Sequence, residues 1–268
     1  MNTTYESAPP PGKNRQHQKT PFRKTYAMVP QSAASDATAI QLMGWRNSRA
    51  WGIVGPTKGF VDSFSQYSVE VFPGGGTRAS GAESDVESVL FVTRGRLQMT
   101  LDGEAQTLRE GSYAYLAPGA HWGALNTSDE TVHLQWIRKA YIPLPGCEAT
   151  SIVAHEHEIR QSAESAAAGG RSTKQLLDPD NLAYDMLMEI VTLNPNGLLP
   201  FAETHAMERS IFVLSGRALY KLNEDWVQVT SGDSLRLHAF SPQACYVSGP
   251  DDFRYLQYKA INRQCRLT

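Results

Sequence analysis

The hydrophobic and polar positions of this chain alternate over short segments that end at turn-forming residues. Residues 65–72 and 96–101 alternate in this way, and the second segment turns at Asp102-Gly103. Further short apolar segments are 89–92, 111–116 and 211–214. Alternation with a period of two is typical of strands with one buried face, and Asp-Gly between two such segments is a hairpin signal. The pattern therefore predicts an all-β fold, either a sandwich or a barrel.

The second half of the chain repeats the first half at a constant offset of 121 residues, as between the glycines at 95 and 216 (216 − 95) or 111 and 232 (232 − 111). The matched residues of the first half are Glu87, Phe91, Val92, Gly95, Arg96 and Gly111, and those of the second half are Glu208, Phe212, Val213, Gly216, Arg217 and Gly232. One offset that holds without a gap indicates an internal repeat. We therefore predict two tandem copies of one small β-barrel.

The repeat divides the chain into four expected parts. Residues 1–45 are expected to form an N-terminal tail and extension, because the first part is rich in Pro, Lys, Arg and Gln. Residues 46–145 are the first barrel, and 181–268 are the second barrel, which carries the candidate site. Between them, 146–180 is rich in Ala, Ser, Gly and Glu and is expected to be a linker, with weak helical character over 159–168.

The composition mainly excludes certain classes of partner and cellular location. The formal net charge of the 268 residues is −2, so no basic field favours nucleic acid or an anionic membrane as a partner. No apolar run approaches the ~20 residues of a membrane-spanning helix. The N-terminal segment lacks the apolar stretch of a secretory signal, and the cysteines Cys147, Cys245 and Cys265 are odd in number and far apart. These features predict a cytoplasmic location.

The repeat unit resembles the cupin family, whose motifs are G-x5-H-x-H-x3,4-E-x6-G and G-x5-P-x-G-x2-H-x3-N. Counting from the motif glycines of the second copy places the first-motif positions at Glu203, His205 and Arg209, and the second-motif histidine position at Gln243. Residues two apart on a strand face the same way, so such side chains can reach one metal ion. The resemblance implies a bicupin, with two tandem cupin barrels of the double-stranded β-helix or jelly-roll type.

The first copy lacks these ligands. The same counting gives Ala82, Ser84, Ser88 and Trp122, none of which is a plausible metal ligand. His121 lies one residue away from the ligand position, where strand alternation turns it to the other face. We therefore expect the first barrel to hold no metal at this position.

The second copy is similar to the (S)-ureidoglycine aminohydrolase family of bicupins, or glyoxylate-induced proteins, of purine and allantoin degradation. The residues that carry the resemblance are 202–205, Glu208, 214–216, Tyr220, Asn223, Trp226, 232–233, Gln243 and 255–259. The resemblance implies a divalent metal, usually manganese. The implied ligands present here are Glu203, His205 and Gln243. The implied substrate contacts are Tyr220, Tyr255 and Lys259.

Arg209 departs from the family, which has a second histidine ligand at this position. A guanidinium stays protonated and cannot ligate a metal. At ~4 Å from a cation it would cost about 4 kcal/mol per unit of metal charge at an effective dielectric of 20. We expect Arg209 to weaken metal binding. Either its side chain points outward and leaves three ligands plus water, or the metal is lost and Arg209 pairs with Glu203 or holds a substrate carboxylate.

The resemblance implies a metal-dependent hydrolase acting on C–N bonds, which converts ureidoglycine to ureidoglycolate and ammonia. Glu203 is the candidate general base, and Lys259 is the candidate partner of negative charge. The candidate substrate-binding residues are Tyr220, Tyr255, Lys259, Arg209 and Gln243. The alternative is a non-catalytic cupin that binds a small carboxylate through Arg209 and Lys259. The expected partners are a small ureido or amino acid and further copies of the chain in a homo-oligomer.

Overall fold

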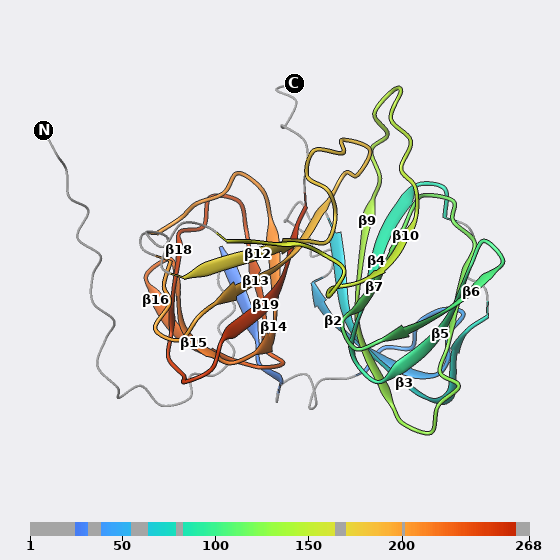
Figure 1. Ribbon diagram of the computed structural model, residues 1–268, viewed down its shortest axis with the longest axis horizontal. Helices are drawn as coiled ribbons and strands as arrows, with labels where there is room; N and C mark the ends of the chain where they lie inside the picture. Colours follow the sequence, from blue (N-terminus) through green and yellow to red (C-terminus); the bar gives the residue numbers. More distant parts are fainter. Residues whose placement is uncertain are drawn as a thin grey trace, which may run out of the picture. The chain divides into compact units, whose positions relative to one another are not determined.

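A computed structural model describes residues 25–31, 39–54, 64–78, 83–163, 170–199 and 202–260. All of its named elements are strands, and every pairing between them is antiparallel (Figure 1). The strands belong to two compact units, which we describe separately. The N-terminal unit comprises 36–159 and 180–185, and the C-terminal unit comprises 1–35, 160–179 and 186–268. Among the described residues, no helix is long and apolar enough to cross a membrane.

The N-terminal unit is one curled antiparallel sheet. Its strands are β2 (Arg46–Val54), β3 (Phe64–Thr77), β4 (Val86–Arg94), β5 (Arg96–Leu101), β6 (Glu104–Arg109), β7 (Ser112–Leu116), β8 (Trp122–Leu125), β9 (Val132–Ala140) and β10 (Ile152–His155). The strand order is β10-β7-β4-β9-β3-β8-β5-β6, and β2 pairs with β3. An apolar core fills the interior, and three of its tryptophans, Trp45, Trp122 and Trp136, pack against one another.

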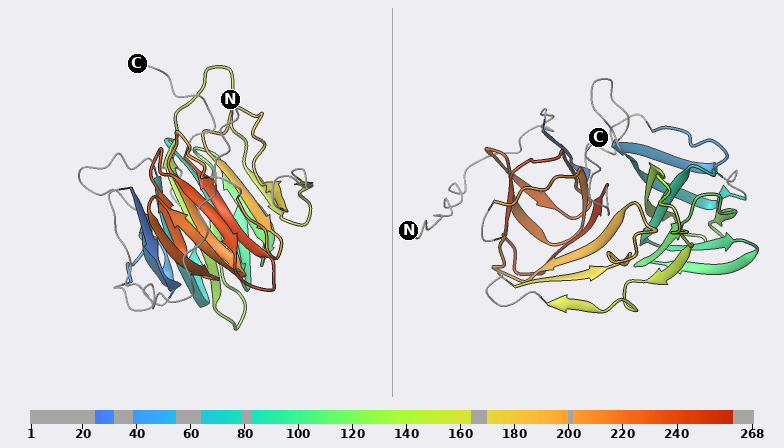
Figure 2. Two further views of the ribbon diagram at one scale, coloured as in Figure 1. Left: turned by 90° about the vertical axis from the view of Figure 1, so that its left-hand side faces the viewer. Right: turned by 90° about the horizontal axis from the view of Figure 1, so that it is seen from above.

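The C-terminal unit divides its strands between two sheets. They are β1 (Tyr26–Val29), β11 (Gln161–Ala163), β12 (Arg171–Gln175), β13 (Leu187–Leu193), β14 (Arg209–Ser215), β15 (Arg217–Leu222), β16 (Asp225–Thr230), β17 (Ser234–Leu237), β18 (Gln243–Val247) and β19 (Phe253–Lys259). One sheet has the order β1-β17-β14-β19-β13-β12-β11, and the other is β16-β15-β18. Figure 2 shows the orange and red strands of this unit curling around an interior.

The internal repeat is confirmed strand by strand. The bounds of β5 and β6 become those of β15 and β16 when 121 is added, as for the first residues of β5 and β15 (217 − 96). The hairpins match as well, because Asp102 and Asn223 occupy the same turn position with φ of 49° and 55°. This left-handed backbone is a conformation that Asp and Asn tolerate better than other residues with a side chain. The prediction of an all-β fold with an internal repeat is correct.

Segments outside the two expected barrels also form strands. The expected linker, 146–180, contains β10, which pairs with β7, and β11 and β12, which extend the sheet beyond β13. The expected N-terminal extension contains β1, which pairs with β17. Each of these strands occupies what would otherwise be an unpaired sheet edge, where backbone N–H and C=O groups need partners. Of the range 159–168, residues 161–163 are strand, and residues 164–168 lie outside the described residues.

Gly216 joins β14 to β15 in a conformation that requires glycine. Its φ is +82°, and a Cβ at this position would lie 2.4 Å from the carbonyl oxygen of Asp252 and 2.8 Å from the Cα of Phe253. Backbone atoms cannot move aside as the end of a side chain can. The glycine therefore allows the turn to pass directly against the chain that enters β19.

Replacing Gly216 with alanine is expected to lower the free energy of unfolding by about 3 kcal/mol, because both the left-handed φ and the backbone clash oppose a Cβ. Gly103 is the matched control, since its φ is +91° but nothing lies within 4 Å of an added Cβ. Gly103→Ala should cost about 1 kcal/mol, from the backbone conformation alone. Urea denaturation of both variants measures the difference, and equal losses would contradict the role given to the close approach.

Candidate functional site

The interior of the C-terminal unit has an apolar half and a polar half. Strand alternation turns every second residue of β13, β14 and β19 inward. At one end of these strands the inward residues belong to the apolar core: Val191, Leu193, Ile211, Val213, Phe253 and Tyr255. At the other end the same faces carry Glu189, Arg209, Gln257 and Lys259. The strand register places Lys259 opposite Arg209 and Gln257 opposite Glu189, so these four polar residues gather in one place.

A two-residue bridge brings the next part of the site to the same interior. The backbone N–H of Glu203 donates to the carbonyl of Gln243 at 2.8 Å, and the N–H of Gln243 donates back at 2.9 Å. Directly opposed residues of an antiparallel pair point their side chains to the same face. Gln243 faces inward, because Cys245, two residues further on β18, belongs to the core. The carboxylate of Glu203 is thereby directed into the barrel.

Side-chain contacts connect these residues further. The hydroxyl of Tyr220 donates to Gln243 Oε1 at 3.0 Å, and Nε2 of His205 lies 3.4 Å from Glu203 Oε2. Tyr220 and Tyr255 are both buried in the core of this unit. The residues singled out by motif counting and by resemblance are Glu203, His205, Gln243, Tyr220, Tyr255 and Lys259. All lie at inward-facing positions except His205, which contacts the inward-facing Glu203.

Glu189 was not singled out from the sequence, although its partner Lys259 was. The carboxylate is 2.7 Å from Lys259 Nζ through Oε1, which also accepts from Gln257 Nε2 at 2.7 Å. Its other oxygen accepts from Gln175 Nε2 at 2.8 Å. Glu189 is almost fully buried, and these three contacts provide the hydrogen bonds that a buried carboxylate needs. The ion pair also fixes the position of the Lys259 ammonium group.

Arg209 lies inside the barrel and does not point outward. Its side chain is 1% exposed, and it starts β14 on the same face as Ile211 and Val213. Among the described residues, none accepts a hydrogen bond from its Nε, Nη1 or Nη2, and no carboxylate lies within ion-pair distance of it. Of the two alternatives left open by the sequence, the structure excludes the outward orientation and shows no pairing with Glu203.

The site keeps the carboxyl group of Glu203 ionised and the hydroxyl groups of Tyr220 and Tyr255 protonated. The hydrogen bond from His205 lowers the pKa of Glu203, and the charge of Arg171, 3.7 Å away, acts in the same direction. Burial raises the pKa of Tyr220 and Tyr255 well above their ordinary values. Glu203 is therefore a carboxylate that can accept a proton, and both tyrosines are hydroxyl donors.

The donors present do not fit a divalent metal at the position that motif counting assigns. Glu203 already faces His205 and Arg171, and the amide oxygen of Gln243 already accepts from Tyr220. The position of the fourth ligand is occupied by a guanidinium that is buried on the interior face and cannot retreat to solvent. A fixed positive charge here opposes a cation.

The corresponding interior of the N-terminal unit is occupied by aromatic packing. Trp122 stacks edge-on against Trp45 and Trp136, and Ser88 is buried on β4. Ser84 lies in an exposed turn, His121 is exposed, and Ala82 lies outside the described residues. None of the placed residues forms a ligand set.

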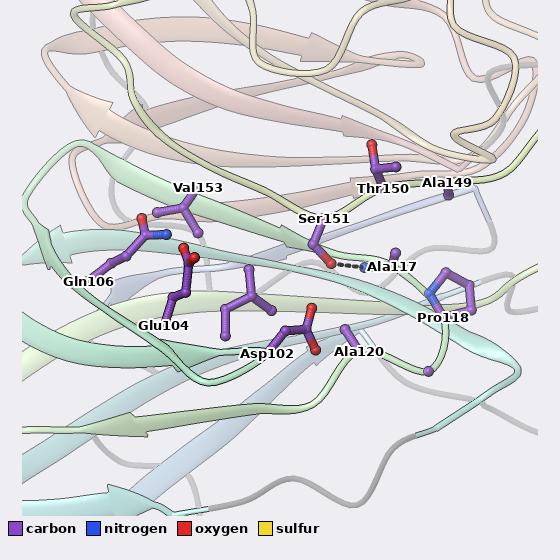
Figure 3. A pocket seen from close by; sticks show the side chains of 12 residues that line it. Asp102, Glu104, Gln106, Ala117, Pro118, Ala120, Ala149, Thr150, Ser151 and Val153 are labelled. Carbon is purple, nitrogen blue, oxygen red and sulfur yellow. Dashed lines mark hydrogen bonds between the residues drawn. The ribbon is translucent and has the colours of Figure 1, made fainter.

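A surface pocket of the N-terminal unit lies elsewhere, between the β5–β6 hairpin and the segments 117–120 and 149–153 (Figure 3). Its acidic side chains, Asp102 and Glu104, are exposed to solvent, and the backbone N–H of His121 donates to Asp102. The pocket contains none of the candidate catalytic, substrate-binding or metal-ligating residues, and the sequence marks Asp102 only as part of a turn.

A buried charged cluster lies on the opposite face of β4 from Ser88. Glu87 is fully buried, accepts from the hydroxyl of Tyr115 at 2.8 Å, and lies 3.9 Å from Lys139 Nζ. Lys139 is closer to Asp185, at 2.6 Å. Burial raises the pKa of Glu87 to about 7, which outweighs the opposing effect of Lys139.

Comparison with known proteins places the chain in a family. The cupin domain model matches residues 68–138. A solved structure described as a putative glyoxylate-induced protein from Pseudomonas aeruginosa superposes with a TM-score of 0.86 and 40% identity, over 94% of each chain. The (S)-ureidoglycine aminohydrolase of Escherichia coli is 29% identical over 76% of this chain and 78% of its own length. The fold and the site define a bicupin. The chain belongs to the family of glyoxylate-induced proteins and (S)-ureidoglycine aminohydrolases.

Metal-containing proteins occur among more distant structures of this fold. An oxalate decarboxylase from Bacillus subtilis, described with Mn(II) centres, superposes with a TM-score of 0.63 over 89% of this chain and 78% of its own. At 10% identity this likeness concerns the fold alone.

The charged cluster of the N-terminal unit predicts a pH-dependent stability. Because the folded pKa of Glu87 is raised, its stabilising contribution is complete below about pH 4.5 and is lost as the pH rises through about 7. Glu87→Gln removes this titration. Between pH 5 and 8 the variant should gain on the order of 3 kcal/mol of unfolding free energy relative to the wild type. Denaturant unfolding at several pH values measures this, and a pH-independent difference would contradict it.

Proposed function

We propose that the C-terminal barrel is the active site of an (S)-ureidoglycine aminohydrolase-type enzyme of purine degradation. The reaction replaces the amino group of ureidoglycine by hydroxyl, so water supplies the new C–O bond and ammonia leaves with the broken C–N bond. The observation that carries the proposal is the gathering of Glu203, Gln243 and Tyr220 in a barrel of a chain related to proteins of that name.

The residues of the site suit hydrolysis at a carbon next to a carboxylate. Glu203 is an ionised carboxylate at a partly exposed position, where it can take a proton from the attacking water. Tyr220 and Tyr255 keep their hydroxyl protons and can orient the polar groups of the substrate. Lys259, held by Glu189, is a fixed cation at the same end of the barrel and can stabilise negative charge.

The metal expected from the resemblance takes no part in this proposal. Manganese would be held by Glu203, His205 and Gln243, but Arg209 and the existing contacts of these side chains oppose it. The remaining expectations stay predictions: a small ureido or amino acid as substrate, a homo-oligomer, and a cytoplasmic location. The relatives favour catalysis over the alternative of a cupin that only binds a carboxylate.

Removing the proposed base should abolish turnover while the protein stays folded. Glu203→Gln keeps the shape of the side chain but cannot accept a proton, so ammonia release from freshly prepared ureidoglycine should fall about a hundredfold or more. The matched control is Glu224→Gln, at an exposed position in the β15–β16 turn, which should leave the rate unchanged. Ammonia release at the wild-type rate in Glu203→Gln, or none from the wild type, would overturn the assignment.

A further inference from the structure

Arg209 is the most unusual side chain in the described part of the molecule. Of the residues that the structure describes, it is the largest that is fully buried, and none of them accepts a hydrogen bond from its Nε, Nη1 or Nη2. A guanidinium carries five N–H donors in a rigid plane, and leaving them unpaired away from water is costly. Such a side chain needs an acceptor that the described residues do not supply, and a bound ligand can supply it.

The neighbouring carboxylates do not serve as that acceptor. Glu189 is engaged by Lys259, Gln257 and Gln175, and Glu203 faces His205 and Arg171. Both acids act on Arg209 through space, but neither forms an ion pair with it within the described residues. The site therefore holds Arg209 close to polar groups while its own donors remain available.

The charges of the site indicate the sign of the missing ligand. Lys259 is paired with Glu189, whereas Arg209 is a buried cation with no carboxylate at ion-pair distance among the described residues. Its positive charge is therefore not neutralised by a direct contact within the described site. A single carboxylate group would neutralise it, and its two oxygens match the fork of a guanidinium.

The polar end of the barrel is the part of the site that lies nearest to solvent. The side chains of His205, Glu203 and Lys259 are 29%, 21% and 18% exposed, so this end is the more open one. Glu203 and His205 lie on the segment before β14. The Glu203–Gln243 bridge holds this segment to β18, and the backbone N–H of Phe240 donates a hydrogen bond to the carbonyl of His205. A small ligand entering here would pass these residues before it meets the guanidinium.

We propose that Arg209 binds the carboxylate of the substrate directly, through a bidentate pair of N–H···O bonds, where the family would place a metal ligand. The proposal rests on the proposed function, which supplies a small α-carboxylate as substrate. Binding of the carboxylate is therefore independent of a divalent metal. Arg209 acts as a substrate-binding residue, and the metal-coordinating role of this position is lost.

The test is calorimetric binding of ureidoacetate, a stable analogue that has the ureido group and the carboxylate but no amine. The full chain is first freed of metal with a chelator. The wild type should bind ureidoacetate, and the corresponding neutral amide should not bind. Arg209→Lys keeps the charge but loses the fork, and should weaken binding about tenfold, whereas Arg209→Met should weaken it about a hundredfold. Arg217→Lys, at an exposed position on β15, is the control and should leave binding unchanged.

Metal content provides a second readout that does not depend on activity. The wild type should retain no stoichiometric manganese after dialysis against Mn²⁺, whereas Arg209→His, which restores the family ligand, should acquire it. The proposal is overturned if ureidoacetate binds only when Mn²⁺ is present, or binds equally to the wild type and both Arg209 variants, or does not bind at all. Metal-free binding that depends on Arg209, without ammonia release from ureidoglycine, would instead reject the proposed function and leave this inference standing.

Discussion

Two backbone hydrogen bonds between Glu203 and Gln243 are the constraint on which the candidate site depends. Glu203 and His205 lie on a segment that is not itself a strand, so neither sheet fixes their direction. The bridge to β18 does so, because directly opposed residues share a face of the sheet. Gln243 is in turn held by the hydroxyl of Tyr220, a fully buried residue of β15. A carboxylate, an imidazole and an amide are thereby positioned by the rigid part of the barrel.

The interior polar groups also explain why the barrel is divided into two halves. A core of apolar residues stabilises one end, where Tyr255 and Phe253 pack against each other. At the other end charged groups are buried, and each buried charge costs several kcal/mol unless it is paired and hydrogen-bonded. The ion pair between Glu189 and Lys259 offsets that cost, whereas Arg209 has no acceptor within the described part of the chain. A protein keeps such an expensive group where function requires it, and the apolar half supplies the stability that makes this possible.

The sequence was sufficient for the fold and for part of the site. Alternation and one constant offset predicted the two barrels, and motif counting found Glu203, His205 and Gln243, because both signals depend on spacing alone. Glu189 could not be found in this way, since one acidic residue in an apolar strand has no pattern to identify it. Gln175 lay in a range that composition marked as a linker. The direction of Arg209 needed the structure, because a long side chain at the end of a strand can point to either solvent or core.

The position of β1 in the chain has a consequence for how the protein is made. Along the sequence, most of the N-terminal unit comes between β1 and the remaining strands of the C-terminal unit, yet the hydroxyl of Tyr26 donates a hydrogen bond to Asp225, 199 residues later. During synthesis the first strand therefore leaves the ribosome long before its partner β17 exists. The N-terminal unit can be completed in the meantime, because its contacts are shorter in sequence, and the C-terminal unit must close last. The barrel that carries the site is thus assembled only when nearly the whole chain has been translated.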